Sequence, residues 1–147
     1  MRALRGGGYL LKHFSSFRAP HLRFFCVQDR LTRFREQPLR MPHLTWRPQN
    51  RDFRAADLLK DDAQEAHALN LIHLQTARRG VDLAPGLFKR KGGRPVDHGG
   101  RPIPPERCAV LIFHAKTLGL SFLSQEDQDL WMNGFAAIIQ RNQLYNT

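Results

Sequence analysis

The sequence predicts an α+β protein with an extended basic N-terminal arm, one helix, a long Gly/Pro loop, and then a β-hairpin and a C-terminal helix. Three observations support this fold class. Twelve of the first 54 residues are Arg or Lys and three are acidic, so this part carries most of the net charge of +10. Glycine and proline dominate residues 80–107, and β-forming residues dominate 108–123. We therefore divide the chain into a targeting-like segment, an Arg-rich arm and a small α+β domain, at residues 1–28, 29–54 and 55–147.

The first 28 residues have the composition of a mitochondrial transit peptide. They contain no acidic residue, and their five cations are interleaved with leucine and phenylalanine. The pattern predicts a short amphipathic helix from about Tyr9 to Phe17 and a location in the mitochondrial matrix. A basic, disordered tail of a cytosolic protein is the alternative. The longest apolar run, Cys108 to Phe113, is too short to cross a bilayer, so we expect no transmembrane segment.

Residues 29–54 predict an extended arm that contacts RNA. All seven cations of this stretch are arginines, which bind phosphate with two parallel hydrogen bonds, and the prolines at 38, 42 and 48 disfavour a long helix. Aromatic residues between the arginines offer stacking surfaces for bases. An acidic protein surface is the alternative partner, and peripheral membrane contact stays open. Together with a second basic cluster in the Gly/Pro loop, the candidate RNA-binding residues are Arg23, Arg30, Arg33, Arg35, Arg40, Trp46, Arg47, Arg51, Lys89, Arg90, Lys91, Arg94 and Arg101.

Residues 55–79 read as a helix that ends before Gly80, with acids near its start and Arg78 and Arg79 in its last turn. The alternation of Ala68 to Leu74 would also suit a strand. The Gly/Pro loop that follows contains the near-repeat Gly-Gly-Arg-Pro but no GxxxxGK[ST] sequence. A nucleotide-binding loop is therefore disfavoured, and we expect a surface loop that contacts phosphates or a partner.

The C-terminal segment has the most regular pattern. Cys108 to His114 and Leu118 to Leu123 form two β-rich runs with a short connection, which predicts an antiparallel hairpin. Ser124, followed three residues later by Asp127, is typical of a helix N-cap. The predicted helix runs to about Gln143, and its buried stripe consists of Leu130, Trp131, Gly134, Phe135 and Ile138.

This strand pair, cap and helix, with the sequence DLWMNGFAAII, resembles the last two strands and C-terminal helix of pleckstrin-homology-like (PH-like) domains. The resemblance covers only the C-terminal hairpin and helix, and it implies that Trp131 is a core residue with Phe135 and Ile138 beside it. The five upstream strands of the family and its basic lipid-binding hairpin are not recognisable in the sequence. Lipid binding is therefore not implied, and an isolated β-β-α unit is favoured over a full domain.

No sequence motif indicates catalysis. Nucleophile elbow, paired carboxylates, metal-ligand spacing and dinucleotide fingerprint are all missing from the sequence, so we expect neither an enzyme nor a cofactor. The leading hypothesis is a structural subunit of a large mitochondrial assembly, namely a mitochondrial ribosomal protein that contacts rRNA through its arm and packs on neighbouring proteins. An accessory peripheral subunit of a respiratory complex or ATP synthase is one alternative. A PH-like adaptor that binds protein or lipid is another.

Overall fold

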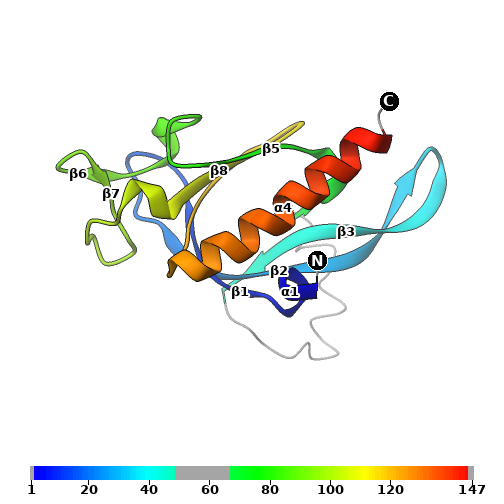
Figure 1. The fold of residues 1–147 in the computed structure, drawn as a ribbon, viewed down its shortest axis with the longest axis horizontal. Helices are drawn as coiled ribbons and strands as arrows, with labels where there is room; N and C mark the ends of the chain where they lie inside the picture. The colour runs from blue at the N-terminus through cyan, green and yellow to red at the C-terminus, as the bar shows by residue number, and fades with distance from the viewer. Residues whose placement is uncertain (1, 49–66, 146–147) are drawn as a thin grey trace.

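The computed structural model describes residues 2–48 and 67–145 of the 147-residue chain (Figure 1). Its main feature is a seven-stranded antiparallel sheet in the order β4-β3-β2-β1-β9-β8-β5. In chain order the elements are α1 (Arg2–Gly6), β1 (Gly8–His13), β2 (His21–Phe34), β3 (Gln37–Arg47), β4 (Ala68–Asn70), η2 (Leu71–His73), β5 (Leu74–Arg79), η3 (Pro85–Leu87), β6 (Arg90–Lys91), β7 (Arg94–Pro95), η4 (Pro105–Arg107), β8 (Cys108–Phe113), β9 (Thr117–Ser121) and α4 (Gln125–Tyr145).

The sheet folds over on itself to form a β-sandwich. β4 and β5 are its two outermost strands, yet only the short turn η2 separates them along the chain. The two edges must therefore lie close together, and the sheet encloses one apolar core. α4 packs along β5 and η2 and covers this core, as Figure 1 shows. Leu10, Phe25, Leu44, Leu111 and Phe135 are all buried in it.

The C-terminal hairpin and helix lie where the sequence places them. The Ser124 hydroxyl accepts a hydrogen bond from the Asp127 N–H at 3.1 Å, which confirms the predicted N-cap. Trp131, Phe135 and Ile138 are buried, as predicted. Leu130 is not part of this stripe, because its side chain is 48% exposed. The predicted role of the remaining stripe residue, Gly134, is confirmed, since a Cβ there would lie 2.4 Å from Leu4 Cδ1.

The predicted α+β class is wrong, because residues 8–47 supply three strands of the sheet. The supposed arm supplies the distal part of β2 and all of β3, which pair along their whole length. Pro38 and Pro42 do not break β3, since β4 pairs only with residues 43–45 and the distal part of β3 is an edge in the described structure. An edge position tolerates a missing N–H, so prolines do not exclude a strand there.

Two predicted helices are likewise replaced by strands. The helix expected from Tyr9 to Phe17 is the strand β1 and the turn after it, and Leu10 and Leu11 are buried on its opposite faces. The first part of the helix expected over 55–79 lies outside the described residues up to position 66. From Ala68 onward this segment is strand, 3₁₀ turn and strand, so the alternative noted for Ala68 to Leu74 is confirmed.

The Gly/Pro segment 80–107 is an insertion that packs on the outer face of β8 and β9. Phe88 is 1% exposed and forms a second small core with Cys108 and Val110. A Cβ at Gly119 would lie 3.0 Å from the Phe88 ring, so the glycine lets the insertion approach the sheet closely. The glycines and prolines of this segment build turns around an anchored aromatic residue.

Candidate functional site: a cationic mouth of the sandwich

One end of the sandwich gathers cations around aromatic rings, and we call this end the mouth. It lies where Lys12 of β1 and Lys116 of the β8–β9 turn approach the Trp46 ring. Strand alternation and register direct Lys12 of β1 inward, on the face of β2 that carries His21 and Arg23. Figure 1 shows the β1–β2 turn in blue at the left, next to the β6–β7 insertion. The mouth consists of Lys12, Phe14, Arg18, His21, Arg23, Trp46 and Lys116.

Two aromatic rings hold the cations of the mouth. The Lys12 ammonium lies 3.9 Å from the centroid of the Phe14 ring and 5.6 Å from that of Trp46. Lys116 approaches the same Trp46 ring at 5.5 Å, and the Arg18 guanidinium lies 4.7 Å from the Phe14 centroid. These are cation–π distances, so the rings stabilise cations that repel one another. Trp46 is 5% exposed and forms the floor of the mouth.

The electrostatics of the mouth favour an anion. Burial, together with the charges of Lys116, Arg23 and Arg18, lowers the pKa of Lys12 from 10.5 to about 8. The three charged groups that contribute to this pKa shift are all cations. A positive charge that is desolvated and repelled binds an anion more strongly than a solvated one does, because the anion relieves both costs.

The two histidines near the mouth act as neutral groups. Arg23 Nη2 donates a hydrogen bond to His21 Nδ1 at 2.9 Å, which requires that this nitrogen be unprotonated. Burial, followed by the charges of Arg23, Arg18 and Lys12, lowers the pKa of His21. Burial, and then Lys12 and Lys116, also lower the pKa of His67, whose ring lies 6.0 Å from Trp46. Neutral imidazoles add hydrogen-bonding capacity without further repulsion.

The β1–β2 turn presents an exposed aromatic side chain beside the cations. Ser15 accepts hydrogen bonds from the Arg18 N–H at 3.3 Å and, through its hydroxyl, from the Phe17 N–H at 3.3 Å. Ser16 N–H also donates to the Gly86 carbonyl at 2.9 Å, which ties the turn to the insertion. The turn is therefore braced on two sides, and it holds Phe17 90% exposed.

The predicted RNA-binding residues fall into separate groups. Arg23, Trp46 and Arg47 lie at or beside the mouth, and the Arg47 guanidinium stacks 5.3 Å from the Phe24 ring centroid. A second group occupies the distal β2–β3 hairpin, and a third occupies the insertion. The second group is Arg30, Arg33, Arg35 and Arg40, and the third is Lys89, Arg90, Lys91, Arg94 and Arg101. Arg51 lies outside the described residues.

Sequence reasoning selected Arg23 and Trp46 but missed the other residues that build the mouth. The sequence pattern places Lys12 and Arg18 in a targeting segment and Lys116 in a hairpin connection. A usable signal existed in Lys12, Arg18 and Arg23, which flank a short turn between two runs of β-forming residues. Lys116 gives no local signal, because only the closure of the sheet brings it to Trp46.

A serine–histidine pair lies outside the mouth and is inaccessible. His13 Nε2 and Ser121 Oγ are 2.8 Å apart, but these residues are 2% and 0% exposed. Burial lowers the pKa of His13 to about 4, and its Nδ1 has no hydrogen-bond partner in the described structure. No substrate reaches this pair, so we assign it to packing against Phe88. No group of His, Cys, Asp or Glu suited to a metal ion occurs within residues 2–48 and 67–145.

The described residues form a β-sandwich that is covered by one C-terminal helix and gathers cations at one end. The sequence matches the PH-like domain family over residues 1–143, and the chain belongs to that family. The resemblance seen at the C-terminus therefore extends to the whole sandwich, and the five upstream strands are β1 to β5. A search of curated proteins gives no match. No helix among the described residues is long and apolar enough to span a membrane.

Proposed function

We propose that this PH-like domain is a non-catalytic adaptor that holds the headgroup of an anionic lipid in its mouth. The observation that carries the proposal is Lys12, a cation 8% exposed, crowded by three other cations and held by two rings. A phosphate group accepts several charge-assisted hydrogen bonds from such a cluster. Its charge also offsets the repulsion among the cations.

The exposed ring of Phe17 supports a lipid as the source of the anion. This ring projects from the same turn that carries Arg18, so a headgroup in the mouth would bring Phe17 to the membrane interface. Inserting a Phe side chain into an apolar environment contributes roughly 1.5–3 kcal/mol. The basic insertion, tied to the turn through Ser16 and Gly86, would add longer-range attraction to the anionic surface.

The test is co-flotation of the protein with phosphatidylcholine vesicles that do or do not contain phosphatidylserine or a phosphoinositide. Lys12→Met and Lys116→Gln should each weaken binding to anionic vesicles roughly tenfold, since a hydrogen bond to a charged group contributes about 1.5–3 kcal/mol. Arg33→Gln, on the distal hairpin, is the control with the same charge change and should bind normally. Equal losses in all three variants would refute a specific mouth site.

Titration with soluble ligands distinguishes binding of the headgroup from binding of the membrane surface. Calorimetric titration with inositol trisphosphate and with inorganic phosphate should give binding that depends on Lys12, whereas Phe17→Ala should leave it unchanged. Binding of these anions without any binding to vesicles would restrict the function to a soluble phosphorylated ligand.

We infer that, if the chain is imported into mitochondria, it keeps its first 28 residues. Leu4, Leu10 and Phe25 are all buried in the core, so removing this segment would take away α1, β1 and part of β2. Import is measured with residues 1–28 fused to a reporter, and retention is measured from the N-terminus of the mature protein. A cytosolic reporter would count against a mitochondrial location.

A further inference from the structure

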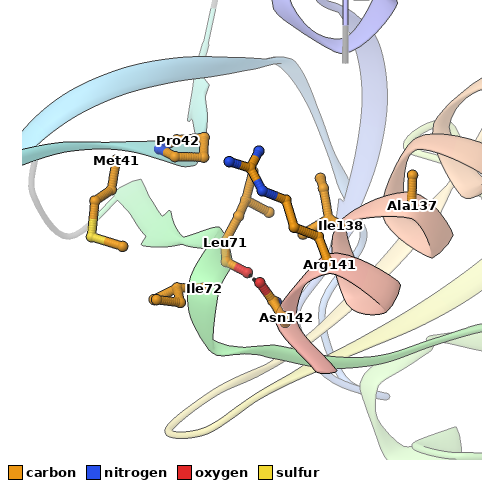
Figure 2. Close-up of a pocket in the computed structure, with 8 residues that line it drawn as sticks. All are labelled: Met41, Pro42, Leu71, Ile72, Ala137, Ile138, Arg141 and Asn142. Atoms are coloured by element: carbon orange, nitrogen blue, oxygen red, sulfur yellow. Dashed lines mark hydrogen bonds between the residues drawn. The ribbon is translucent and has the colours of Figure 1, made fainter. Parts of the chain in front are cut away.

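A second candidate site lies between β3, η2 and the C-terminal half of α4. It is a groove of about 190 Å³, and four residues along β3, roughly 14 Å, separate it from Trp46. Figure 2 shows β3, η2 and α4 each supplying one wall. Its lining is mainly apolar and consists of Met41, Pro42, Leu71, Ile72, Ala137, Ile138, Arg141 and Asn142.

The groove is preformed. Asn142 Nδ2 donates to the carbonyl oxygen of Leu71 at 2.8 Å (Figure 2). It also donates to that of Leu74 at 3.1 Å, and the two bonds fix α4 against the η2 turn. Leu71 and Ile138 are buried, while Ala137 and Arg141 are exposed at the rim. A volume of about 190 Å³ is below the roughly 300–1,000 Å³ of small-molecule pockets. It suits one or two apolar side chains of a larger partner.

A two-stranded ribbon continues from the wall of the groove. Beyond Pro42, β2 and β3 run together to their turn, and Figure 1 shows this hairpin projecting past the rest of the sheet. Cross-strand register pairs Arg40 with Leu31 and Pro38 with Arg33. Strand alternation puts both pairs on the same face as Pro42, at roughly 7 Å and 14 Å from it. Leu31 is 69% exposed on this face.

This ribbon face is cationic. Asp29, which pairs with Pro42 in the register, forms a salt bridge with Arg5 at 3.1 Å. Arg33 and Arg40 are both exposed farther out. The surface thus combines an apolar groove, an exposed leucine and two arginines. Arg33 lies opposite Pro38, so the two arginines are two positions apart along the ribbon. Its charge complement is a segment with carboxylates.

We propose that the groove and this ribbon face bind an acidic, amphipathic polypeptide segment of a partner protein. One apolar side chain would fill the groove, and carboxylates two and four residues away in an extended segment would face Arg40 and Arg33. The groove favours protein over RNA, because bases stack on aromatic rings, and Phe34 lies on the opposite face of the ribbon with Arg35 stacked 5.3 Å from its centroid. A phospholipid headgroup is polar and charged, so it does not match the mainly apolar lining of the groove.

Fluorescence anisotropy with a labelled model peptide tests this proposal. The peptide carries one Phe, with Glu at the second and fourth positions after it. Its affinity should fall at least tenfold for Arg33→Glu/Arg40→Glu, which reverses two exposed charges. The affinity should fall similarly for Ala137→Trp, which fills the rim of the groove without changing the charge. Replacing Glu by Gln in the peptide should abolish the effect of the double charge reversal. Replacing Phe by Ser should abolish the effect of Ala137→Trp.

The charge-matched control is Lys91→Glu/Arg94→Glu on the β6–β7 hairpin, which should leave peptide binding unchanged. Equal losses in this control would reduce the result to general electrostatics and overturn the site. If single-stranded RNA or anionic vesicles bind through Arg33 and Arg40 while Ala137→Trp has no effect, the partner is nucleic acid or lipid and the proposal fails. Because the mouth and the groove use different residues, failure here leaves the proposed headgroup site untouched.

Discussion

The two ends of β2 carry similar cations in opposite physical settings. At the mouth, Arg23 shares a bounded space with Lys12, Arg18 and Lys116, and two rings lie within 5.6 Å of the Lys12 ammonium. At the distal end, Arg33 and Arg40 project from a ribbon into solvent. The comparison teaches that the count of basic residues predicts a polyanionic partner but not the kind of site. Burial and neighbouring rings support the proposed anion site, whereas exposure beside an apolar groove supports the proposed docking face.

Both regions depend on one core, so the largest expected effect is the loss of that core. Trp131 is 3% exposed, and its ring lies 5.9 Å from that of Phe135. Trp131→Ala should lower the free energy of unfolding by about 3–5 kcal/mol, measured by urea denaturation. Binding at the mouth and at the groove should then be lost together. Leu130→Ala, at the exposed neighbour, should change stability by no more than about 0.5 kcal/mol; equal effects would refute the assigned burial.

The sequence alone predicts the C-terminal unit because its signals are local. Ser124 and Asp127 form a cap within one turn, and Trp131, Phe135 and Ile138 recur at helical spacing. The strands β1 to β3 could not be predicted in this way. Their charge, their prolines and the absence of acid in residues 1–28 have an equally good local explanation as a targeting segment and an arm. Pairing between β2 and β3 decides the structure, and pairing is not visible in composition.

The candidate site follows the same division. Arginines of the distal hairpin were predicted to contact a partner, and alternation along β2 could have sorted them by face once a strand was assumed. The mouth requires contacts between Lys12, Trp46 and Lys116, which lie on three different segments of the chain. Only a closed sheet with a known register brings such residues together. Composition therefore located the charge of this protein but not its site.

Replacing the buried cation Lys12 should change how the free energy of unfolding depends on pH, whereas replacing an exposed distal arginine should not. Lys12 has an ordinary pKa of 10.5 in the unfolded chain and about 8 in the folded protein, so between these values the unfolded state binds more protons and wild-type stability rises with pH. Lys12→Met should be more stable than wild type at pH 7, by on the order of 2 kcal/mol after allowance for solvent screening.

The difference between the two proteins should shrink as the pH rises from 8 to 10.5. The measurement is urea denaturation of both proteins across this range, with Arg33→Met as the matched distal control. Arg33 is exposed, so its replacement should give a curve parallel to that of the wild type. A Lys12→Met variant less stable than wild type at every pH would contradict the assigned desolvation.

Phe17 tests whether the mouth or the distal hairpin contacts the membrane. Its ring is 90% exposed, so Phe17→Ala should leave the free energy of unfolding within about 0.5 kcal/mol of wild type. Vesicle binding should weaken roughly tenfold, because a buried Phe contributes about 1.5–3 kcal/mol. Phe34→Ala at the distal turn, where the ring is 36% exposed, is the matched control and should not affect vesicle binding. The opposite ranking would assign the membrane contact to the distal hairpin.

The smallest expected effect concerns the turn that ends the distal hairpin. Arg35 and Glu36 form a two-residue connection between β2 and β3 and both have positive φ angles, 53° and 65°. Two positive φ values define the type I′ hairpin turn, which favours Asn-Gly and imposes a steric cost of roughly 1–2 kcal/mol per residue on other side chains. Arg35→Asn/Glu36→Gly should relieve this strain without changing the net charge.

Because the ribbon beyond Pro42 is exposed, the gain should appear mainly as local protection. Hydrogen exchange at the Thr32 and Leu39 amides should slow by roughly tenfold, which corresponds to about 1.4 kcal/mol, while the midpoint of global unfolding moves little. Exchange at Leu10 and Phe25, in the core, should be unchanged and serves as the internal reference. If the Thr32 and Leu39 amides exchange as fast as in the wild type, the positive φ angles of the turn do not destabilise the hairpin. If the core amides slow equally, the hairpin unfolds only with the whole domain, and the two ends of β2 share one stability.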